Sequence, residues 1–266
     1  MLVYMKNRNL TAREIRFKLS VVTIAKNEEK YIEDFLQAVR WADEIIVVDN
    51  GSKDRTIEIA KRYTGKIFSN TESNLGLLKQ FALSKATKDW IIVLDVDELV
   101  SEALSVEIKN VLSQKTPFDG FSIPYTNFFL GHHMQTKMLE YAKIRLFKRG
   151  RGSVAPNPIH EEMIIQGHIG YLKGKILHYS FRSLSQVIKK FIYYAKLESP
   201  SLFAKKERTI IQKLTLYPAH MFWAIFVKDE GWRDGIWGFL LALCFAYYEF
   251  ARYYFLWLYA SRQKSS

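Results

Sequence analysis

The chain has 266 residues, 48% of them hydrophobic, which is enough for one substantial α/β domain with an appendage and hardly enough for two full domains. A single cysteine, Cys244, excludes an internal disulfide. The formal net charge of +12 indicates an anionic partner, which could be nucleic acid, anionic lipid or a phosphorylated substrate. Aromatic and basic residues are mixed after residue 190, and this combination favours a membrane interface over nucleic acid.

Residues 1–18 are basic but contain no long apolar run, so they do not resemble a signal peptide and are expected to be a poorly ordered lead-in. Strands and helices then alternate over residues 19–100, which predicts right-handed βαβ units and a parallel sheet. Such sheets bind ligands at the carboxyl ends of their strands. The expected strands are Leu19–Ile24, Glu44–Val48, Lys66–Phe68 and Trp90–Leu94, and the expected helices are Glu28–Arg40, Asp54–Tyr63 and Leu75–Ala86.

The rest of the chain divides into an irregular and a helical part. Residues 101–180 are punctuated by prolines, and short strands at Gly120–Pro124 and Lys143–Lys148 predict a mixed sheet that completes the same domain. From Leu184 onward the pattern is helical to near the end of the chain.

The strongest local pattern is Asp95-Val96-Asp97-Glu98, which directly follows the predicted strand Trp90–Leu94. Alternate residues of an extended segment point to the same side, so Asp95 and Asp97 are expected to face the same way. Two carboxylates at the end of a buried strand can hold Mg²⁺ or Mn²⁺, whose other ligands come from water and substrate phosphates. A bare D-x-D is common on protein surfaces, and its position at this strand end is what favours a metal site.

Asp49 ends the second predicted strand and should share a rim of the sheet with the acidic pair. Its carboxylate can accept a hydrogen bond from a nucleobase N–H. The ordinary alternative is structural, because Asn50-Gly51 is typical of a turn and Ser52 or Asp54 can cap the next helix. Both interpretations hold together if Asp49 binds a ligand while Ser52 and Asp54 support the loop.

These segments together resemble family 2 glycosyltransferases of the GT-A fold. The resemblance over residues 19–100 rests on the order and spacing of SVVTIAKNEE, VVDNGSKDRT, Asn74-Leu75-Gly76 and DWIIVLDVDE. The later segments KIRLFKR, NPIHEE, ILHYS and KDEGWRDGIWG resemble the branch that contains lipopolysaccharide-core β-1,4-glucosyltransferases. The resemblance implies a Rossmann-like, mostly parallel sheet flanked by helices. Residues 19–183 would be the catalytic domain, with a nucleotide-binding half over 19–100 and an acceptor half over 101–183.

The resemblance also implies a binding site for a nucleotide-sugar donor, for which a UDP-sugar is expected. Asp49 would read the uracil edge, and Lys79 falls where the family often has a basic residue near the donor. Arg145 in KIRLFKR could bind a phosphate or simply belong to a basic surface strand. The residues that would contact the donor are Ala25, Glu28, Asp49, Lys79 and Asp95.

The implied metal site holds Mn²⁺ or Mg²⁺ through Asp95 and Asp97, with His178 as the late histidine that often completes it. Glu161 falls where the family places its catalytic base, which serves a single displacement with inversion. The late residues have ordinary alternatives, since His178 could be a hydrogen-bonded core histidine and Glu161 and Glu162 could be a solvated pair. Which of these two glutamates would be the base stays open.

Residues 184–266 are predicted to form a helical extension that associates with a membrane. Leu184–Leu214 mixes lysines with apolar residues, which is typical of an amphipathic helix on anionic lipid or of a packed helix with a solvated basic face. Gly235–Tyr248 has no charged residue but is shorter than the ~20 residues of a bilayer span. Phe222–Tyr259 is therefore expected to lie in the membrane interface, with a tilted span or an oligomer contact as alternatives.

The resulting hypothesis is an inverting, metal-dependent enzyme that moves glucose or another hexose from a UDP-sugar to a lipid-linked glycan such as lipopolysaccharide core. It would act as a peripheral or monotopic protein at the cytoplasmic face of the bacterial inner membrane, with no nucleic acid as partner. A nucleotidyltransferase is one alternative, although TIAKNEE is not the Gly-rich basic loop such enzymes usually carry. A non-catalytic, basic membrane-binding protein on the same scaffold is the other, and the intact D-V-D and Glu161 argue against it.

Overall fold

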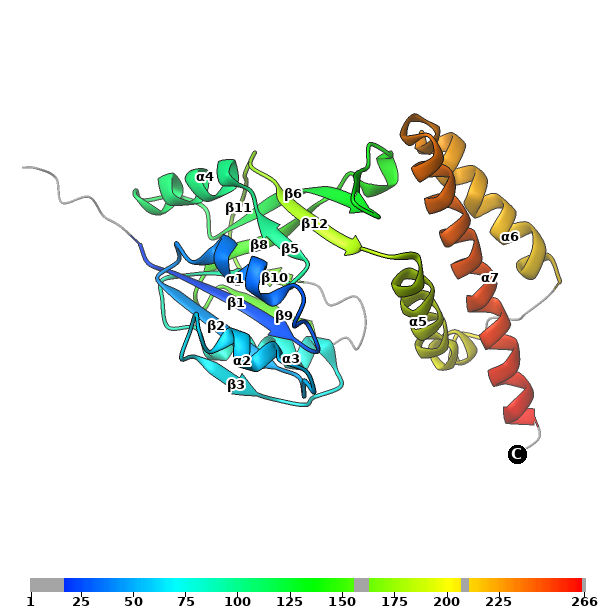
Figure 1. Cartoon of the computed structure of the whole chain (residues 1–266), viewed down its shortest axis with the longest axis horizontal. Helices are drawn as coiled ribbons and strands as arrows, with labels where there is room; N and C mark the ends of the chain where they lie inside the picture. The colour runs from blue at the N-terminus through cyan, green and yellow to red at the C-terminus, as the bar shows by residue number, and fades with distance from the viewer. Residues whose placement is uncertain (1–16, 156–162, 207–210, 265–266) are drawn as a thin grey trace, which may run out of the picture. The chain divides into compact units, whose positions relative to one another are not determined.

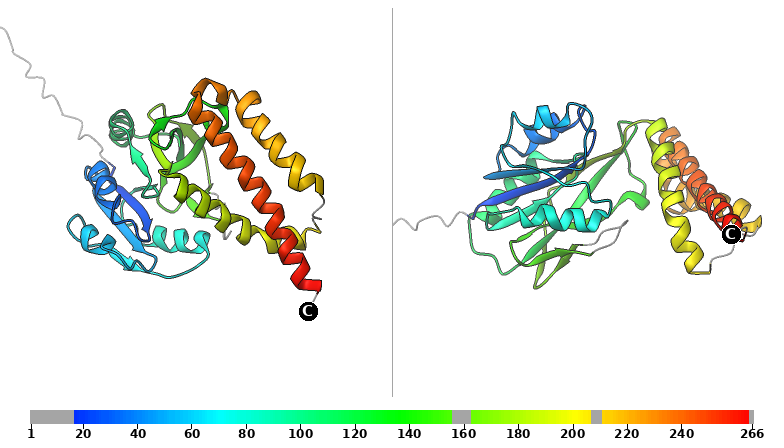
Figure 2. Two further views of the ribbon diagram at one scale, coloured as in Figure 1. Left: turned by 45° about the vertical axis from the view of Figure 1, so that its right-hand side comes forward. Right: turned by 90° about the horizontal axis from the view of Figure 1, so that it is seen from below.

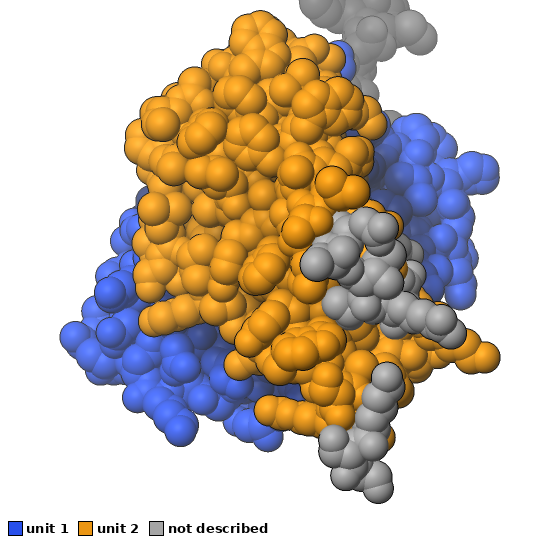
Figure 3. Space-filling view, turned by 90° about the vertical axis from the view of Figure 1, so that its right-hand side faces the viewer, with its two compact units in different colours: residues 1–95, 102–122, 144–174 blue, residues 96–101, 123–143, 175–266 orange. Residues whose placement is uncertain are grey.

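The structure, a computed structural model, describes residues 17–155, 163–206 and 211–264 (Figure 1). The chain divides into two compact units, which are coloured separately in Figure 3. The first unit comprises the chain up to residue 95 together with residues 102–122 and 144–174. The second unit comprises residues 96–101, 123–143 and everything from residue 175 onward. The domain boundaries expected from the sequence stay a prediction.

A mixed sheet forms the centre of the first unit. Its strands are β1 (Leu19–Ala25), β2 (Glu44–Asp49), β3 (Ile67–Ser69), β4 (Trp90–Val93) and β8 (Ala142–Lys148). The order β3-β2-β1-β4 is parallel throughout, as the alternation of strands and helices predicts, and β8 joins β4 in the antiparallel direction. In the β1–β2 register, Ala25 lies opposite Asp49, so both strands end at the same edge of the sheet.

The helices of this unit are α1 (Ile32–Val39), α2 (Thr56–Ala60), α3 (Leu75–Ser84) and α4 (Glu102–Leu112). The spacing of apolar residues in α1 gives it one buried face, which is the pattern that predicted this helix. The helix begins at Ile32, a turn later than expected, because the preceding residues are held by the loop contacts described below. The core of the unit packs Val22, Ile46 and Val93 of the sheet against Leu78 of α3.

Three short strands complete the first unit. They are β9 (Gly152–Val154), β10 (Met163–Ile165) and β11 (Ile169–Tyr171). β9 and β10 form an antiparallel pair, and β11 lies parallel to the first residues of β6 (Gly120–Phe129). β6 begins in this unit and continues into the second, so it is longer than the strand Gly120–Pro124 that the sequence predicts.

The second unit has its own small sheet and a group of helices. Its strands are the later part of β6, β5 (Glu98–Val100), β7 (His132–His133) and β12 (Ile176–Phe181). β12 lies between β6 and β5, parallel to the first and antiparallel to the second. This register sets His178 of β12 opposite Glu98 of β5 on one side and Asn127 of β6 on the other.

Helices form the rest of the second unit, which confirms the helical pattern predicted from Leu184 onward. They are α5 (Leu184–Ala204), α6 (Ile211–Trp223), α7 (Ile236–Lys264) and the short turns η1 (Lys137–Leu139), η2 (Ala224–Lys228) and η3 (Gly231–Asp234). α5 and α6 both pack along α7, as two directions of view show (Figure 2). Among the helices that the structure describes, none combines the length and the apolar content needed to cross a bilayer.

The segment KDEGWRDGIWG has a structural role in this unit. The buried carboxylate of Asp234 accepts hydrogen bonds from the backbone N–H groups of Gln135 and Thr136, at 2.8 Å and 3.0 Å. A side chain at Gly238 is not tolerated, because its Cβ would lie 1.8 Å from the carbonyl oxygen of Gly231. The segment therefore anchors the chain after β7 to the start of α7, and a carboxylate and two glycines are the residues that this close contact requires.

A buried carboxylate also holds the first unit together at the start of β2. Glu44 is 5% exposed and pairs with the Lys66 ammonium, while the hydroxyl groups of Ser20 and Thr87 donate to the same carboxylate. Burial alone would raise the pKa of Glu44, but these partners lower it from 4.5 to about 2. The charged form of Glu44 is therefore part of the folded structure.

Replacing Glu44 by glutamine should reduce the free energy of unfolding at pH 7 by about 3 kcal/mol, the size of the pKa shift expressed as energy. Because the pKa of this carboxyl is lower in the folded state, its contribution is complete above about pH 4.5 and is lost as the pH falls toward 2. Urea denaturation at several pH values would measure both effects. Glu102→Gln changes an exposed glutamate and is the control. If Glu44→Gln lost stability in acid as steeply as the wild type, the assignment would be contradicted.

Candidate functional site

The loops that follow β1 and β2 are tied together by hydrogen bonds between side chains and backbone. The Asn27 N–H donates to Ser52 Oγ at 3.0 Å, and the Lys53 N–H donates to Asn27 Oδ1 at 2.8 Å. Asp54 accepts from the Glu29 N–H at 3.1 Å. Asn27 has a φ of 57°, a left-handed conformation that asparagine tolerates better than most residues. Ser52 and Asp54 thus have the supporting role that was one interpretation of the sequence.

Asp49 lies at the end of β2 beside this loop junction. Its Oδ1 accepts a hydrogen bond from the Ser52 N–H at 3.0 Å, which orients the carboxylate. Oδ2 accepts none from the residues that the structure describes, and the residue is half-buried. Ala25, opposite in the register, is buried with its carbonyl oxygen accepting from the Asn50 N–H, and the Glu28 N–H donates to Thr56 Oγ1 at 2.7 Å.

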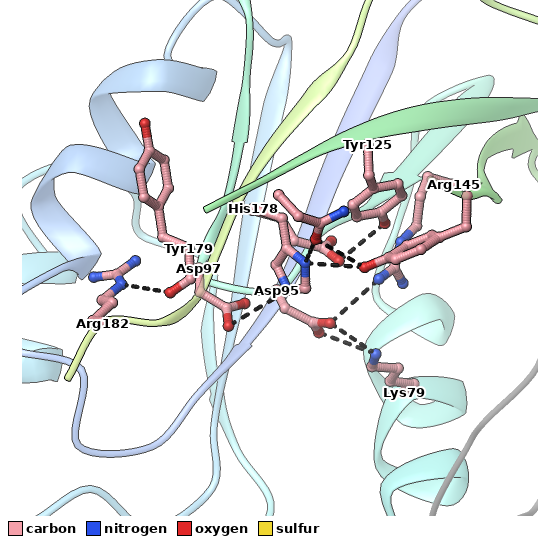
Figure 4. Close-up of polar contacts among 11 residues, drawn as sticks. Lys79, Asp95, Asp97, Tyr125, Arg145, His178, Tyr179 and Arg182 are labelled. Atoms are coloured by element: carbon pink, nitrogen blue, oxygen red, sulfur yellow. Dashed lines mark hydrogen bonds and ion pairs between the residues drawn. The ribbon is translucent and has the colours of Figure 1, made fainter. Parts of the chain in front are cut away.

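Asp95 lies between two buried cations of the first unit (Figure 4). The Lys79 ammonium from α3 is 3.0 Å from Asp95 Oδ1, and the Arg145 guanidinium from β8 is 3.3 Å from Oδ2. The side chains of Lys79 and Arg145 are 7% and 9% exposed, whereas that of Asp95 is 38% exposed. Lys79 and Arg145 thus direct two cationic groups at one half-exposed carboxylate, and such groups can also donate charge-assisted hydrogen bonds to an anionic ligand such as a phosphate.

The position of Arg145 excludes one of the two interpretations left open by the sequence, and phosphate binding stays a prediction. A surface strand is wrong for this residue, because Arg145 is buried within β8 and directed at Asp95. One signal in the sequence pointed this way, since Arg145 interrupts the apolar run Ile144-Arg145-Leu146-Phe147. A charge in such a run is rarely left without a partner.

The D-V-D segment does not continue the strand before it. β4 ends at Val93, a turn covers Val96 and Asp97, and β5 begins at Glu98. The expectation that Asp95 and Asp97 face the same way rested on an extended backbone, and that premise is wrong. Asp95 belongs to the first unit and Asp97 to the second, with one residue between them in the chain.

Asp97 faces His178 within the second unit (Figure 4). Its Oδ2 is 3.7 Å from His178 Nε2, and its carbonyl oxygen accepts from the Tyr179 N–H at 2.9 Å. The two side chains are 31% and 16% exposed, so both are reachable from solvent. β12 therefore contributes the backbone bond and the imidazole that fix Asp97.

The other nitrogen of His178 is held by a buried amide. Asn127 Nδ2 donates to the Leu139 carbonyl oxygen at 2.7 Å, which leaves Asn127 Oδ1 facing His178 Nδ1 at 2.7 Å. An amide oxygen can only accept, so this network assigns the proton of the imidazole to Nδ1. The Tyr141 hydroxyl lies 3.1 Å from both Asn127 Oδ1 and His178 Nδ1. In its neutral form, the imidazole therefore presents an Nε2 lone pair toward Asp97.

Glu98 and Tyr125 form a further polar pair that the sequence did not identify. Glu98 is 1% exposed, and its Oε1 accepts a hydrogen bond from the Tyr125 hydroxyl at 2.9 Å. The Tyr125 ring meets the His178 ring edge to face, with centroids 5.6 Å apart. Only the register of β5, β6 and β12 brings these residues together, because 27 positions separate Glu98 from Tyr125 in the chain.

Two parts of the predicted site need separate mention. Glu161, the expected base, and its neighbour Glu162 lie outside the described residues. Among the described residues, no three His, Cys, Asp or Glu side chains are close enough together to hold a metal ion. The Asp97–His178 pair is thus a candidate for part of a metal site, and Asp95 is engaged with Lys79 and Arg145.

Comparisons with known proteins identify the family of this chain. Residues 20–151 match the model of glycosyl transferase family 2. The lipopolysaccharide core biosynthesis glycosyltransferase LpsC of Rhizobium meliloti (strain 1021) is 25% identical over 243 residues, which cover 88% of this chain and 90% of LpsC. A glycosyltransferase of Rickettsia typhi is 27% identical over 248 residues, which cover 88% of this chain and 85% of the relative.

The fold has a counterpart among solved structures. The mannosyltransferase PcManGT from Pyrobaculum calidifontis, solved in complex with GDP-Man and Mn²⁺, matches with a TM-score of 0.51 at 13% identity. The match covers 89% of this chain and 86% of the mannosyltransferase, and at this identity it concerns the fold alone. Together with the family match, it confirms the GT-A fold expected from the sequence. This chain is a glycosyltransferase and belongs to glycosyltransferase family 2.

Proposed function

We propose that this glycosyltransferase moves a hexose, glucose first among the candidates, from a UDP-sugar to a lipid-linked glycan such as lipopolysaccharide core. The observation that carries the donor part is that Lys79 and Arg145 direct two cationic groups at the half-exposed Asp95. A sugar diphosphate is the anionic group that this family's donors supply. The similarity to LpsC, which covers nearly all of both chains, supports the acceptor class.

The nucleoside part of the donor binds at the ends of β1 and β2. Asp49 offers Oδ2 to a base N–H, while the Ser52 N–H holds the carboxylate in place through Oδ1. Uracil presents one ring N–H between two carbonyl groups, so a single carboxylate oxygen can read it. Glu28 and the backbone around Ala25 line the same pocket in this proposal.

A divalent ion, Mn²⁺ or Mg²⁺, fits the donor atoms of Asp97 and His178. Two ligands each about 2.1 Å from one ion lie at most about 4.2 Å apart, and Oδ2 and Nε2 are 3.7 Å apart. Donation of the other imidazole N–H to a fixed acceptor is typical of metal-binding histidines, and Asn127 is that acceptor. That Asp95 joins these ligands remains a prediction.

The reaction is a single displacement with inversion at the anomeric carbon. A bound divalent ion supplies Lewis-acid neutralisation of the charge that develops on the leaving diphosphate. Lys79 and Arg145 bind the donor phosphates through charge-assisted hydrogen bonds. Glu161 removes the proton of the acceptor hydroxyl as that oxygen attacks, a role that follows from the family resemblance alone.

The enzyme acts as a peripheral or monotopic protein at the cytoplasmic face of the bacterial inner membrane, where UDP-sugars and lipid-linked acceptors meet. The resemblance to a lipopolysaccharide enzyme supports this site of action. The basic and apolar helices of the second unit provide a surface of suitable chemistry.

The donor nucleotide can be identified by ligand-induced stabilisation. A UDP-sugar at 100 times its dissociation constant should stabilise the folded state by about 2.7 kcal/mol. Thermal denaturation with UDP-glucose, other UDP-sugars and GDP-mannose in the presence of Mn²⁺ would measure it. Stabilisation by the GDP-sugar alone would overturn the uracil assignment, and the Asp49→Ala variant should lose the response to UDP.

Removing the carboxylate of Asp97 should lower the rate of sugar transfer by about 100-fold or more, because Lewis-acid stabilisation is worth several kcal/mol. The rate for Asp97→Ala would be measured as transfer of radiolabelled sugar into cell-envelope acceptors with added Mn²⁺. The donor would be the nucleotide-sugar that gives the largest thermal stabilisation. Glu140→Ala removes an exposed carboxylate of the same unit and serves as the control. A near wild-type rate for Asp97→Ala would disprove its role in the metal site.

Replacing Lys79 or Arg145 by methionine should weaken donor binding about tenfold or more, since each provides a charge-assisted hydrogen bond to phosphate. Calorimetric titration with UDP would give the dissociation constants. Lys61→Met removes the same charge from an exposed position of this unit and should bind UDP normally. Unchanged affinity in both test variants would show that these cations serve only to hold Asp95.

The imidazole of His178 should carry its proton on Nδ1 at neutral pH, because Asn127 Oδ1 accepts there. Two-dimensional ¹⁵N–¹H NMR of the histidine-labelled protein would report the tautomer. Asn127→Leu should mix the tautomers and lower Mn²⁺ affinity by about 10- to 100-fold, the usual effect of losing such a partner. Thr126→Val is the control, and a pure Nε2–H signal in the wild type would refute the assignment.

A further inference from the structure

One face of α7 carries large apolar side chains that are exposed. Ile236, Leu243, Phe250, Tyr254 and Trp257 are 61%, 44%, 40%, 39% and 50% exposed. Their separations of seven, seven, four and three residues keep them on one side of a helix. From Ile236 to Trp257 this face runs about 32 Å, because a helix rises about 1.5 Å per residue. These five residues are called the α7 apolar face.

The other sides of α7 are packed. Leu241 and Leu256 are fully buried, and Phe245 stacks near Phe191 of α5 with ring centroids 5.1 Å apart. α6 covers another side, where Tyr217 meets Tyr253 at 5.5 Å. The apolar face is therefore what remains of α7 after α5 and α6 have packed against it. Such a large exposed patch marks a site of interaction.

The apolar face broadens toward α6. Phe239, itself 38% exposed, contacts the rings of Phe222 and Phe226 at 5.4 Å and 5.8 Å. On the neighbouring turns of the chain, Trp223 and Val227 are about half exposed. Tryptophan and tyrosine, both present here, are enriched where a protein meets the headgroup level of a bilayer.

Basic side chains outnumber acidic ones in these helices. The described residues of α5, α6 and α7 include two acidic side chains, Glu198 and Glu249, and both pair with Arg252, at 2.8 Å and 3.2 Å. Both carboxylates are thus mostly buried and paired inside the helical group. Lysines on the outside of α5 include the exposed Lys189 and Lys196. An anionic surface complements this distribution, and contact between two copies would bring like charges together.

A cleft between α5 and α7 lies at the same end of α7 as Trp257. Its volume is about 330 Å³, and it is lined by Lys196, Ser199, Phe255, Leu258, Tyr259 and Arg262. Two cations at an apolar floor match an amphiphile with an anionic head. The Lys196 ammonium already lies over the Phe255 ring, 5.1 Å from its centre, so the cation and the apolar floor adjoin.

We propose that the α7 apolar face docks on an anionic lipid bilayer and that the cleft of Lys196 and Arg262 binds the phosphate of a phospholipid headgroup. Phe250, Tyr254 and Trp257 lie in the interfacial layer, with the two cations at the level of the phosphates. The docking surface stands on the exposed residues and charges alone. Its use, which is to bring the enzyme to a lipid-linked acceptor, rests on the proposed function.

Vesicle flotation of the full chain tests this directly. The wild type should float with anionic vesicles made of phosphatidylcholine with about 30% phosphatidylglycerol. Phe250→Glu together with Trp257→Glu should lower the partition coefficient at least about tenfold, because two apolar contacts are lost and two negative charges are added. Val106→Glu together with Tyr171→Glu changes two exposed apolar residues of the first unit in the same way and should float normally.

The headgroup site is tested separately. Lys196→Gln together with Arg262→Gln should reduce partitioning to the anionic vesicles about 25-fold, since each basic residue near such a surface contributes a factor of about five. Weak binding to pure phosphatidylcholine should be unchanged in this variant. Inorganic phosphate at about 10 mM tests whether the cleft binds the free anion instead of a lipid. If the lipid headgroup is the ligand, this phosphate should not displace the wild type from vesicles.

Three results would overturn the proposal: no flotation of the wild type, equal flotation of the Phe250/Trp257 variant, or a dimer in light scattering that this variant dissolves while vesicles do not bind. Melting curves establish that each variant is folded. UDP binding by calorimetry is independent of this surface, so a variant that binds UDP but not vesicles separates the docking surface from the donor site. A wild type that floats but transfers no sugar would refute the proposed function and leave the docking surface intact.

Discussion

The ion pairs that Asp95 makes with Lys79 and Arg145 set the chemistry of the first unit. Both cations are buried, and a buried cation without a partner would cost several kcal/mol. The half-exposed carboxylate therefore keeps them charged and aimed at one point, from α3 and from β8. In the proposed reaction, the donor diphosphate binds to these two cations, whose desolvation is already compensated in the folded protein. The proposed phosphate site is therefore preorganised.

In the second unit, strand register orients the polar side chains. β12 places His178 between Asn127 on one neighbouring strand and Glu98 on the other, while its backbone also holds Asp97 through Tyr179. The same strand leads directly into the α5 helix. The residues that orient the imidazole and the helices that carry the proposed membrane surface thus belong to one compact unit. The same compact unit therefore holds the proposed lipid-binding surface and the Asp97–His178 pair.

The stabilising contacts of the segment KDEGWRDGIWG explain a motif that its residue types alone do not. Asp234 is acidic and adjoins basic residues, which is also the composition of a binding site. Its carboxylate accepts hydrogen bonds from two backbone N–H groups, and Gly238 has no space for a side chain. Buried carboxylates of this kind, like Glu44 in the other unit, hold chain segments that are distant in sequence.

The sequence by itself determined the parallel βαβ half, the carboxylates at its strand ends, the family and the helical C-terminal region, because these follow from short-range periodicity and from motifs contiguous in the chain. Only the tertiary structure decided that Arg145 is buried against Asp95, that the D-V-D segment turns, and that Asn127 fixes the tautomer of His178. It also decided which face of α7 stays exposed. These properties depend on contacts between residues tens of positions apart, such as Asn127 and His178, and strand register and helix packing set such contacts while local pattern does not.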